Sequence, residues 1–229
     1  MKVQPKKVLN RDQASKRIFS IGVLGLGIMG SAIGNNLLES GHDVWGFDPD
    51  VSARKRFSKI GAQVCPNAAR VIERCEVILT SLPNSEALFD AVDAVIQVGK
   101  RNSILIETST LLIEDKVEAR LKLKKKGIHM LDCPLSGTGA QAVTKDLTVY
   151  ASGSTKHIQF ASPIFMDFAK EYFDLGEFGN GMKMKLIANL LVAIHNVSTA
   201  EALLMSQRFN IPIDRAVEVL SGGAGGSKM

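Results

Sequence analysis

The apolar positions of this chain fall into short runs from residue 20 onward, and longer amphipathic segments separate these runs. Short apolar runs that end in turn residues predict buried strands, and the segments between them have the length expected of helices. This alternation is typical of an α/β fold, in which helices cover both faces of a doubly wound parallel sheet. The predicted strands of the chain cover residues 20–24, 43–48, 77–81, 103–108, 129–132 and 147–152.

One helix of this alternating region is predicted over residues 112–126. Its apolar residues Leu112, Val117 and Leu121 recur at helical intervals. Basic residues collect in its last turn, where the helix macrodipole favours positive charge.

After residue 154 the pattern predicts helices alone, over residues 155–170, 182–208 and 212–220. The second of these would extend about 40 Å, a length that suits a helix between two domains. One long helix and one short helix offer too few faces to enclose a core. We therefore expect residues 181–229 to form a partial all-helical C-terminal domain that further residues or a partner chain complete.

Gly25-Leu26-Gly27-Ile28-Met29-Gly30 follows the first predicted strand and opens an amphipathic helix that reaches Ser40. In a dinucleotide-binding turn, Gly25 allows the tight turn, Gly27 lets the backbone approach a pyrophosphate, and Gly30 permits close helix packing. The alternative is a glycine-rich turn that only connects a strand to a helix. In this context the motif predicts a Rossmann-type dinucleotide-binding domain over residues 20–180.

Asp48 ends the second predicted strand, about twenty residues beyond the glycine motif. A carboxylate at this place accepts hydrogen bonds from the ribose hydroxyls of NAD and repels the 2′-phosphate of NADP, so NAD is favoured. Alternatively, Asp48 only shapes a turn before Pro49, although Asp50 suits that role better. Leu82-Pro83 and Ser109-Thr110 follow later strands, at the edge where doubly wound sheets bind ligands.

Lys185 and Asn189 lie four residues apart on the long predicted helix, and their side chains diverge by about 40° around its axis. A lysine ammonium group and an amide on one helical face can transfer a proton and bind a polar substrate. Lys183 points about 200° away from Lys185, which favours a solvated position. His195 also points away from this face, so we expect it to be a packing or surface residue.

Residues 1–19 contain six basic residues and one acidic residue, which accounts for the whole net charge of +5. We expect this segment to be a basic, flexible tail. The neutral remainder, with 6% aromatic residues overall, offers no electrostatic surface for nucleic acid. Polar residues after Val8-Leu9 argue against a secretory signal, and an organellar transit peptide is the second interpretation. No segment is expected to span a membrane.

The three cysteines Cys65, Cys75 and Cys133 are odd in number and lack metal-ligand spacing. This usage predicts reduced thiols in a cytoplasmic protein, with no metal site. Cys133 lies between the last two predicted strands, where a small buried hydrophobe is favoured over a reactive thiol.

Together these motifs resemble the β-hydroxyacid dehydrogenases, the group that includes 3-hydroxyisobutyrate dehydrogenase and, more distantly, 6-phosphogluconate dehydrogenase. The resemblance extends from about Ser20 to the end of the chain. It is carried by residues 22–30, 36–37, 41–44, 82–83, 109–110, the loop Asp132-Cys133-Pro134-Leu135-Ser136-Gly137-Thr138, and Gly179-Asn180-Gly181 with Lys185 after it.

The resemblance implies that Ser136, Gly137 and Thr138 bind the substrate carboxylate, that Lys185 is the catalytic residue, and that Asn189 binds substrate. It also implies that Ser109 and Thr110 place the nicotinamide, and that the enzyme pairs as a homodimer through its helical region. Thr138 stands where many relatives have a second glycine, and Ala188 where many have another asparagine. Relatives also continue for several dozen residues with a further motif near the cofactor.

The sequence therefore predicts an oxidoreductase that transfers a hydride between NAD and a small 3-hydroxy acid, with Lys185 as general acid and base. One alternative is a noncatalytic NAD-binding or interaction module. The other is an imine reductase of the same architecture. The carboxylate loop together with Lys185 favours the hydroxy acid.

Overall fold

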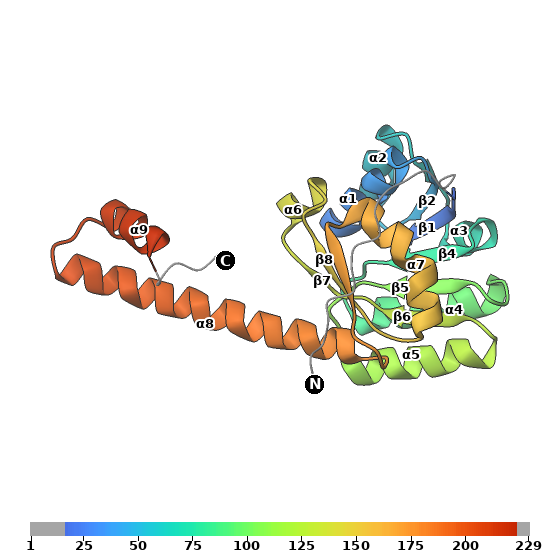
Figure 1. Cartoon of the computed structure of the whole chain (residues 1–229). Coiled ribbons are helices and arrows are strands. Elements are labelled where there is room, and N and C mark those ends of the chain that lie inside the picture. The colour runs from blue at the N-terminus through green and yellow to red at the C-terminus, as the bar shows by residue number, and fades with distance from the viewer. Residues whose placement is uncertain (1–16, 224–229) are drawn as a thin grey trace.

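The computed structural model describes residues 17–223, and its central element is a six-stranded parallel sheet (Figure 1). The strand order β3-β2-β1-β4-β5-β6 places the first strand at the centre, so the chain winds outward in both directions. This is the strand order of a doubly wound dinucleotide-binding sheet, and it confirms the predicted fold class. The strands are β1 (Ser20–Leu24), β2 (Asp43–Phe47), β3 (Gln63–Val64), β4 (Val77–Thr80), β5 (Ile104–Glu107) and β6 (His129–Asp132).

Helices cover both faces of this sheet, which explains why its inner strands β4 and β5 are buried at every position. In β4, Val77 and Leu79 belong to one buried apolar cluster, and Ile78 belongs to the cluster on the opposite face. A parallel strand that is buried on both faces therefore has a continuous run of apolar residues in its sequence. The connecting helices are α1 (Ile28–Glu39), α2 (Val51–Lys59), α3 (Ala68–Arg74), α4 (Ser85–Val98) and α5 (Ile113–Lys125).

The helix α5 confirms the helix predicted over residues 112–126. The face that it buries is not the apolar face that the sequence indicated. Leu112, which precedes it, and Val117 and Leu121 within it are exposed. The buried face instead carries Lys116, with Ala119 and Leu123. The fully buried lysine is paired with two carboxylates of the sheet, which lie at the candidate site.

A second sheet follows, with the order β7-β8-β9. Its strand β9 corrects the expectation of helices alone after residue 154, because α7 ends at Phe168 and the chain then pairs in parallel with β8. Three of the four β9 side chains are exposed, so the segment lacks the apolar pattern of a buried strand. The elements are β7 (Leu135–Ser136), α6 (Gly139–Val143), β8 (Thr148–Ala151), α7 (Thr155–Phe168) and β9 (Glu171–Asp174).

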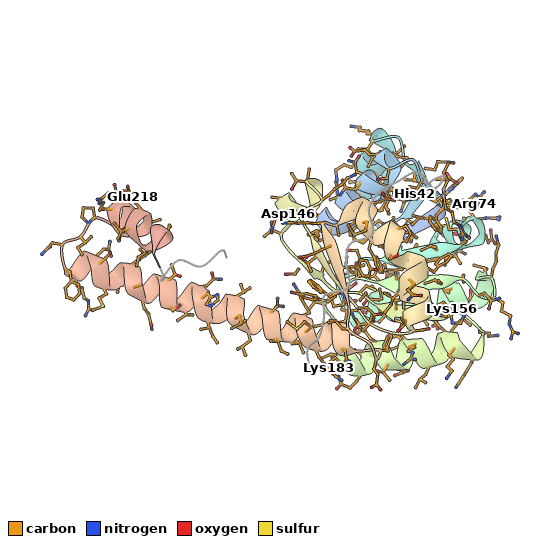
Figure 2. All side chains as sticks on the ribbon, viewed as in Figure 1. His42, Arg74, Asp146, Lys156, Lys183 and Glu218 are labelled. Carbon is orange, nitrogen blue, oxygen red and sulfur yellow. The ribbon has the colours of Figure 1, made fainter. Side chains whose placement is uncertain are left out.

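The long helix α8 (Asn180–Arg208) confirms the predicted helix of residues 182–208 and begins two residues earlier. Its 29 residues span about 43 Å, and it extends away from the sheets to α9 (Ile213–Gly222), which folds back beside its far end (Figure 1). Side chains along most of α8 stand clear of every other element (Figure 2). The exposed fraction is 51% for Leu186 and 60% for both Leu190 and Val197.

The folded body begins slightly earlier than the sequence indicates, because Phe19, which we assigned to the tail, is buried. Its backbone N–H donates to His42 Nδ1, and the Arg17 guanidinium lies 4.6 Å from its ring centroid. Aromatic and cation–π contacts therefore hold these residues against the body. The rest of the predicted tail, residues 1–16, lies outside the described residues.

Candidate active site

The glycine turn between β1 and α1 has the shape that its sequence predicts. Gly25 has a φ of +91°, and a Cβ at this position would collide with the Ser81 carbonyl oxygen. A Cβ on Gly30 would likewise collide with the Gly25 carbonyl, so both positions require glycine. Gly27, by contrast, has no atom within 4 Å of its ideal Cβ position. It precedes α1 without a side-chain cap, so the first N–H groups of the helix face an open approach that suits a pyrophosphate.

Asp48 follows β2 and lies beside this turn, where it is half-buried. Its Oδ2 accepts a hydrogen bond from Leu26 N at 2.8 Å, and its Oδ1 accepts one from Asp50 N at 2.8 Å. Asp48 therefore ties the glycine turn to the end of β2. Asp50 has the turn role expected of it, since it caps α2 by accepting from Ser52 N and Ala53 N.

Trp45 is the one tryptophan of the sequence and lies in β2, three residues before Asp48. Its Nε1 donates to Asp43 Oδ2 at 2.9 Å. The Arg74 guanidinium carbon lies 4.9 Å from its ring centroid. The indole is therefore held on both its polar edge and one face.

The loops after β4 and β5 meet at the same edge of the sheet. Ser109 is buried, and its Oγ accepts a hydrogen bond from Leu82 N at 2.8 Å. Pro83 and Thr110 are exposed. The hydroxyl of Ser109 thus connects the two loops, and Thr110 is open to solvent at this edge.

The predicted carboxylate loop lies against the glycine turn, because a Cβ on Gly139 would contact the Ile28 side chain. Thr138 N donates to Gln141 Oε1 at 2.9 Å, and Thr138 Oγ1 accepts from Gln141 N at 3.3 Å. These two bonds form a capping box that begins α6. The N–H and the hydroxyl of Thr138 are therefore already bonded to Gln141. Ser136 and Gly137 precede the cap, with Gly137 at a φ of +137°.

Sequence reasoning missed a buried charge cluster at the carboxyl edge of the sheet, formed by Glu107, Lys116 and Asp132, all 0% exposed. Lys116 Nζ lies 2.5 Å from Glu107 Oε2 and 2.8 Å from Asp132 Oδ1. It also donates to the Ser109 carbonyl oxygen at 2.6 Å. Lys116 shares a helical face with Ala119 and Leu123. This position beside two apolar residues is the one feature of the sequence that could have indicated a buried lysine.

The ionisation of this cluster follows from its burial and its pairing. Burial raises the pKa of Glu107, against the opposing effect of the Lys116 ammonium group. Burial alone would lower the pKa of Lys116, but the two carboxylates outweigh it and raise that pKa above its ordinary value. Lys116 therefore remains charged at neutral pH.

The same cluster anchors the start of α8. Asp132 Oδ2 accepts a hydrogen bond from Met182 N at 2.9 Å. Ser152 Oγ accepts from Gly181 N at 2.9 Å and from Gly179 N at 3.2 Å. A Cβ on Gly181 would collide with the Tyr150 carbonyl, so the helix packs directly on strand backbone. The first turn of α8 is thus bonded to the ends of β6 and β8.

Lys185 lies on the next turn of α8, and this helix contacts β7 and β8. Its side chain is half-buried, and burial lowers its pKa below the ordinary value of 10.5. Asn189 lies one turn further and is exposed. Lys183 is exposed and bonds to Asn180, which confirms its predicted solvated position (Figure 2). His195 is partly buried further along α8.

Cys133 has the predicted role of a small buried hydrophobe. It is 0% exposed, and burial raises its pKa well above the ordinary value. A thiol held in this state is a poor nucleophile. Among residues 17–223, no group of histidine, cysteine and acidic side chains could hold a metal ion.

A doubly wound sheet whose first turn presents glycine backbone to an anion, with an acidic residue after the second strand, defines a dinucleotide-binding protein. Family models agree with this class. The NAD-binding domain of 6-phosphogluconate dehydrogenase matches residues 20–202, and the NAD-binding domain of NADP-dependent 3-hydroxyisobutyrate dehydrogenase matches residues 179–229.

Curated relatives extend the likeness over most of the chain. It is 34% identical to 3-sulfolactaldehyde reductase of Escherichia coli over 90% of this chain and 70% of the relative. It is 31% identical to L-threonate dehydrogenase of Cupriavidus necator over 92% of this chain and 72% of the relative. The chain therefore belongs to the β-hydroxyacid dehydrogenase family, whose members named here are oxidoreductases.

A solved structure shows the same fold. The 3-hydroxyisobutyrate dehydrogenase of Mycobacterium tuberculosis, with L-serine, superposes with a TM-score of 0.86 at 26% identity. The match covers 92% of this chain and 72% of that one.

The helix α8 bears on the expectation that no segment spans a membrane. Within the described residues it is the one helix long and apolar enough to cross a membrane by length and composition, with a mean hydropathy of 1.4 over its most apolar window. The family match over residues 179–229 includes the whole of this helix. One helix of this kind is weak evidence for a membrane span, because a core helix passes the same test.

Proposed function

We propose that this chain is an NAD-dependent dehydrogenase of a small 3-hydroxy acid, with Lys185 as general acid and base. The observation that carries the proposal is the position of Lys185. It is half-buried, it has a lowered pKa, and it follows a helix start that is bonded to the edge of the sheet where the cofactor loops meet. A lysine with a pKa nearer the working pH transfers protons more effectively.

The bound NAD would supply the hydride acceptor, and the residues of the chain would supply position and proton transfer. In this proposal the backbone of residues 25–30 holds the pyrophosphate, and Asp48 faces the ribose. Leu82, Pro83, Ser109 and Thr110 border the nicotinamide. Ser136 and Gly137 bind the substrate carboxylate with Asn189 beside them, and Lys185 removes the hydroxyl proton during oxidation.

Thr138 contributes to this site by fixing the shape of the loop, because its N–H and hydroxyl cap α6. Residues 20–180 then form the nucleotide domain and residues 181–229 part of the helical domain. The three buried free cysteines support a cytoplasmic location. Imine reductases share the fold at 18% identity or less, which carries no argument for their reaction.

The proposal is tested by offering the full chain a panel of short 3-hydroxy acids with NAD or NADP and recording reduced nicotinamide by absorbance at alkaline pH. Turnover of at least one acid is expected. Nucleotide binding without turnover of any acid would favour the noncatalytic module, and turnover of cyclic imines alone would favour the imine reductase.

The first prediction concerns cofactor preference. The chain is expected to bind NAD more tightly than NADP, since the Asp48 carboxylate would repel a 2′-phosphate. Asp48→Asn should narrow this preference by about tenfold, which corresponds to one lost charge repulsion of about 1.4 kcal/mol. Calorimetric titration of both cofactors measures it.

Asp50→Asn is the matched control, because it removes the same charge two residues away, where Asp50 caps α2. Its effect on the NAD-to-NADP ratio should be small. Equal affinity of the unmodified chain for both cofactors would contradict the assignment of Asp48.

The second prediction concerns assembly. We expect a homodimer in which the apolar residues of α8 face a second copy, because so large an exposed stripe is unfavourable in water. Light scattering of the purified chain should report twice the monomer mass. Changing Leu186 and Leu190 together to glutamate should shift the population to monomer, whereas changes at exposed Lys124 and Lys125 should leave it unaltered. A compact monomer at all concentrations would refute the prediction.

A further inference from the structure

We infer that Lys116 is a positioning residue for the reaction: it joins the Ser109 turn and the first turn of α8 into one unit, and so holds Lys185 in place beside the substrate loop. This inference rests on the proposed function of Lys185. It assigns a role to a residue that cannot itself touch substrate, because Lys116 is 0% exposed.

On one side, the cluster fixes the turn after β5. Lys116 Nζ donates to Ser109 O, and Glu107 Oε1 accepts from Ser109 N at 2.8 Å. Both backbone polar groups of Ser109 are therefore bonded, and its hydroxyl holds Leu82 N. The cofactor edge of the sheet is fixed by these bonds.

On the other side, the cluster fixes α8. The Asp132 carboxylate binds Lys116 through Oδ1 and Met182 N through Oδ2. Lys185 follows Met182 by three residues, or about 4.5 Å along the helix axis. A continuous set of bonds thus links the Ser109 turn to Lys185 through the Lys116 ammonium group.

The charge of Lys116 is needed for this link. Without it, the Glu107 and Asp132 carboxylates would share a buried site with no counter-ion, and Asp132 Oδ1 would lose the partner that holds the carboxylate in place. An Asp132 carboxylate that Lys116 no longer holds is free to rotate, and its bond from Met182 N weakens as the geometry is lost. The first turn of α8 would then loosen, and water would reach Lys185 more easily.

The experiment compares the full chain with Lys116→Met and with a control, Lys125→Met, which replaces an exposed lysine on the same helix. Hydrogen exchange by mass spectrometry measures the protection of residues 179–185. The pH dependence of the reductive methylation of Lys185 measures its pKa. Titration measures NAD affinity. None of these measurements depends on turnover, and kcat and KM are added for any acid that the chain oxidises.

For Lys116→Met we expect exchange of residues 179–185 to rise about tenfold or more and the Lys185 pKa to move up toward 10.5. NAD affinity should fall, because the Ser109 turn at the cofactor edge loses its bond from Nζ. The loss of activity should fall on kcat more than on KM. Lys125→Met should match the unmodified chain. A folded Lys116→Met variant with unchanged exchange and unchanged Lys185 pKa would overturn the inference.

Ser152→Ala keeps the test decisive if Lys116→Met does not fold. It removes the hydroxyl that accepts from Gly179 N and Gly181 N but leaves the three charges in place. The same loosening and the same rise in pKa are expected, and their absence would overturn the link from cluster to helix. If the unmodified chain oxidises no hydroxy acid, the proposed function fails, and exchange and pKa still decide the inference.

Discussion

Lys185→Ala is expected to lower kcat by about 10²- to 10⁴-fold, the usual effect of losing a general acid or base. The lysine would remove the substrate proton during oxidation and return it during reduction, and no other lysine of α8 shares its burial. Cofactor affinity should change by less than about twofold, since Lys185 is assigned to proton transfer and not to the nucleotide. Steady-state kinetics at saturating substrate and an NAD titration measure the two effects.

Lys183→Ala provides the control, because this neighbouring lysine is exposed and bonds only to Asn180 among the contacts described for its side chain. It should retain nearly full turnover. The rate of oxidation in the unmodified chain should rise with pH through the Lys185 pKa, which lies below 10.5, and this rise should vanish in Lys185→Ala. If Lys185→Ala retains full turnover, another residue must be the general acid and base.

Lys116→Met is expected to reduce the free energy of unfolding by about 3–5 kcal/mol, the usual cost of removing one partner from a buried ion pair. Two buried carboxylates would remain without a counter-ion. Domains of this kind are stabilised by about 5–15 kcal/mol, so the variant should still fold at low temperature. Urea denaturation at neutral pH measures the difference.

The sign of the pH effect provides a check. Because the folded state raises the Lys116 pKa, the stabilisation is complete below the ordinary value of 10.5 and is lost as the pH rises through the raised pKa. The difference in the free energy of unfolding between the unmodified chain and Lys116→Met should therefore decrease in strong alkali. The exposed change Lys125→Met should cost less than about 0.5 kcal/mol. A loss under about 1 kcal/mol for Lys116→Met would mean that the carboxylates are satisfied without it.

The fold was largely predictable because its strongest signals are local. Continuous apolar runs such as Val77–Thr80 are what parallel strands buried on both faces require, and the glycine turn is defined by backbone constraints within six residues. The strand Glu171–Asp174 was missed because it is mostly exposed and depends on pairing with β8. Its partner is more than twenty residues away, and local propensity does not encode that contact.

Residues of the candidate site could be proposed from the sequence only where the residue type and its place in a local motif indicate a chemical role. Lys185 is half-buried on α8 and Asp48 lies beside the glycine turn, and the roles predicted for both stay predictions. The engagement of Thr138 with Gln141, and the burial of Lys116, are tertiary facts. A lysine on a helix rich in basic residues resembles any solvated lysine until Glu107 and Asp132 are brought beside it, so sequence alone could not distinguish it.

The solitary tryptophan of this chain provides a built-in optical probe. Trp45 is fixed in β2 by Asp43 and Arg74, three residues before the carboxylate proposed to face the ribose. Its fluorescence therefore reports on one known place in the molecule, without contributions from other indoles. Reduced nicotinamide absorbs where indole emits, so quenching of Trp45 would follow cofactor binding in the unlabelled protein, including variants that have lost turnover.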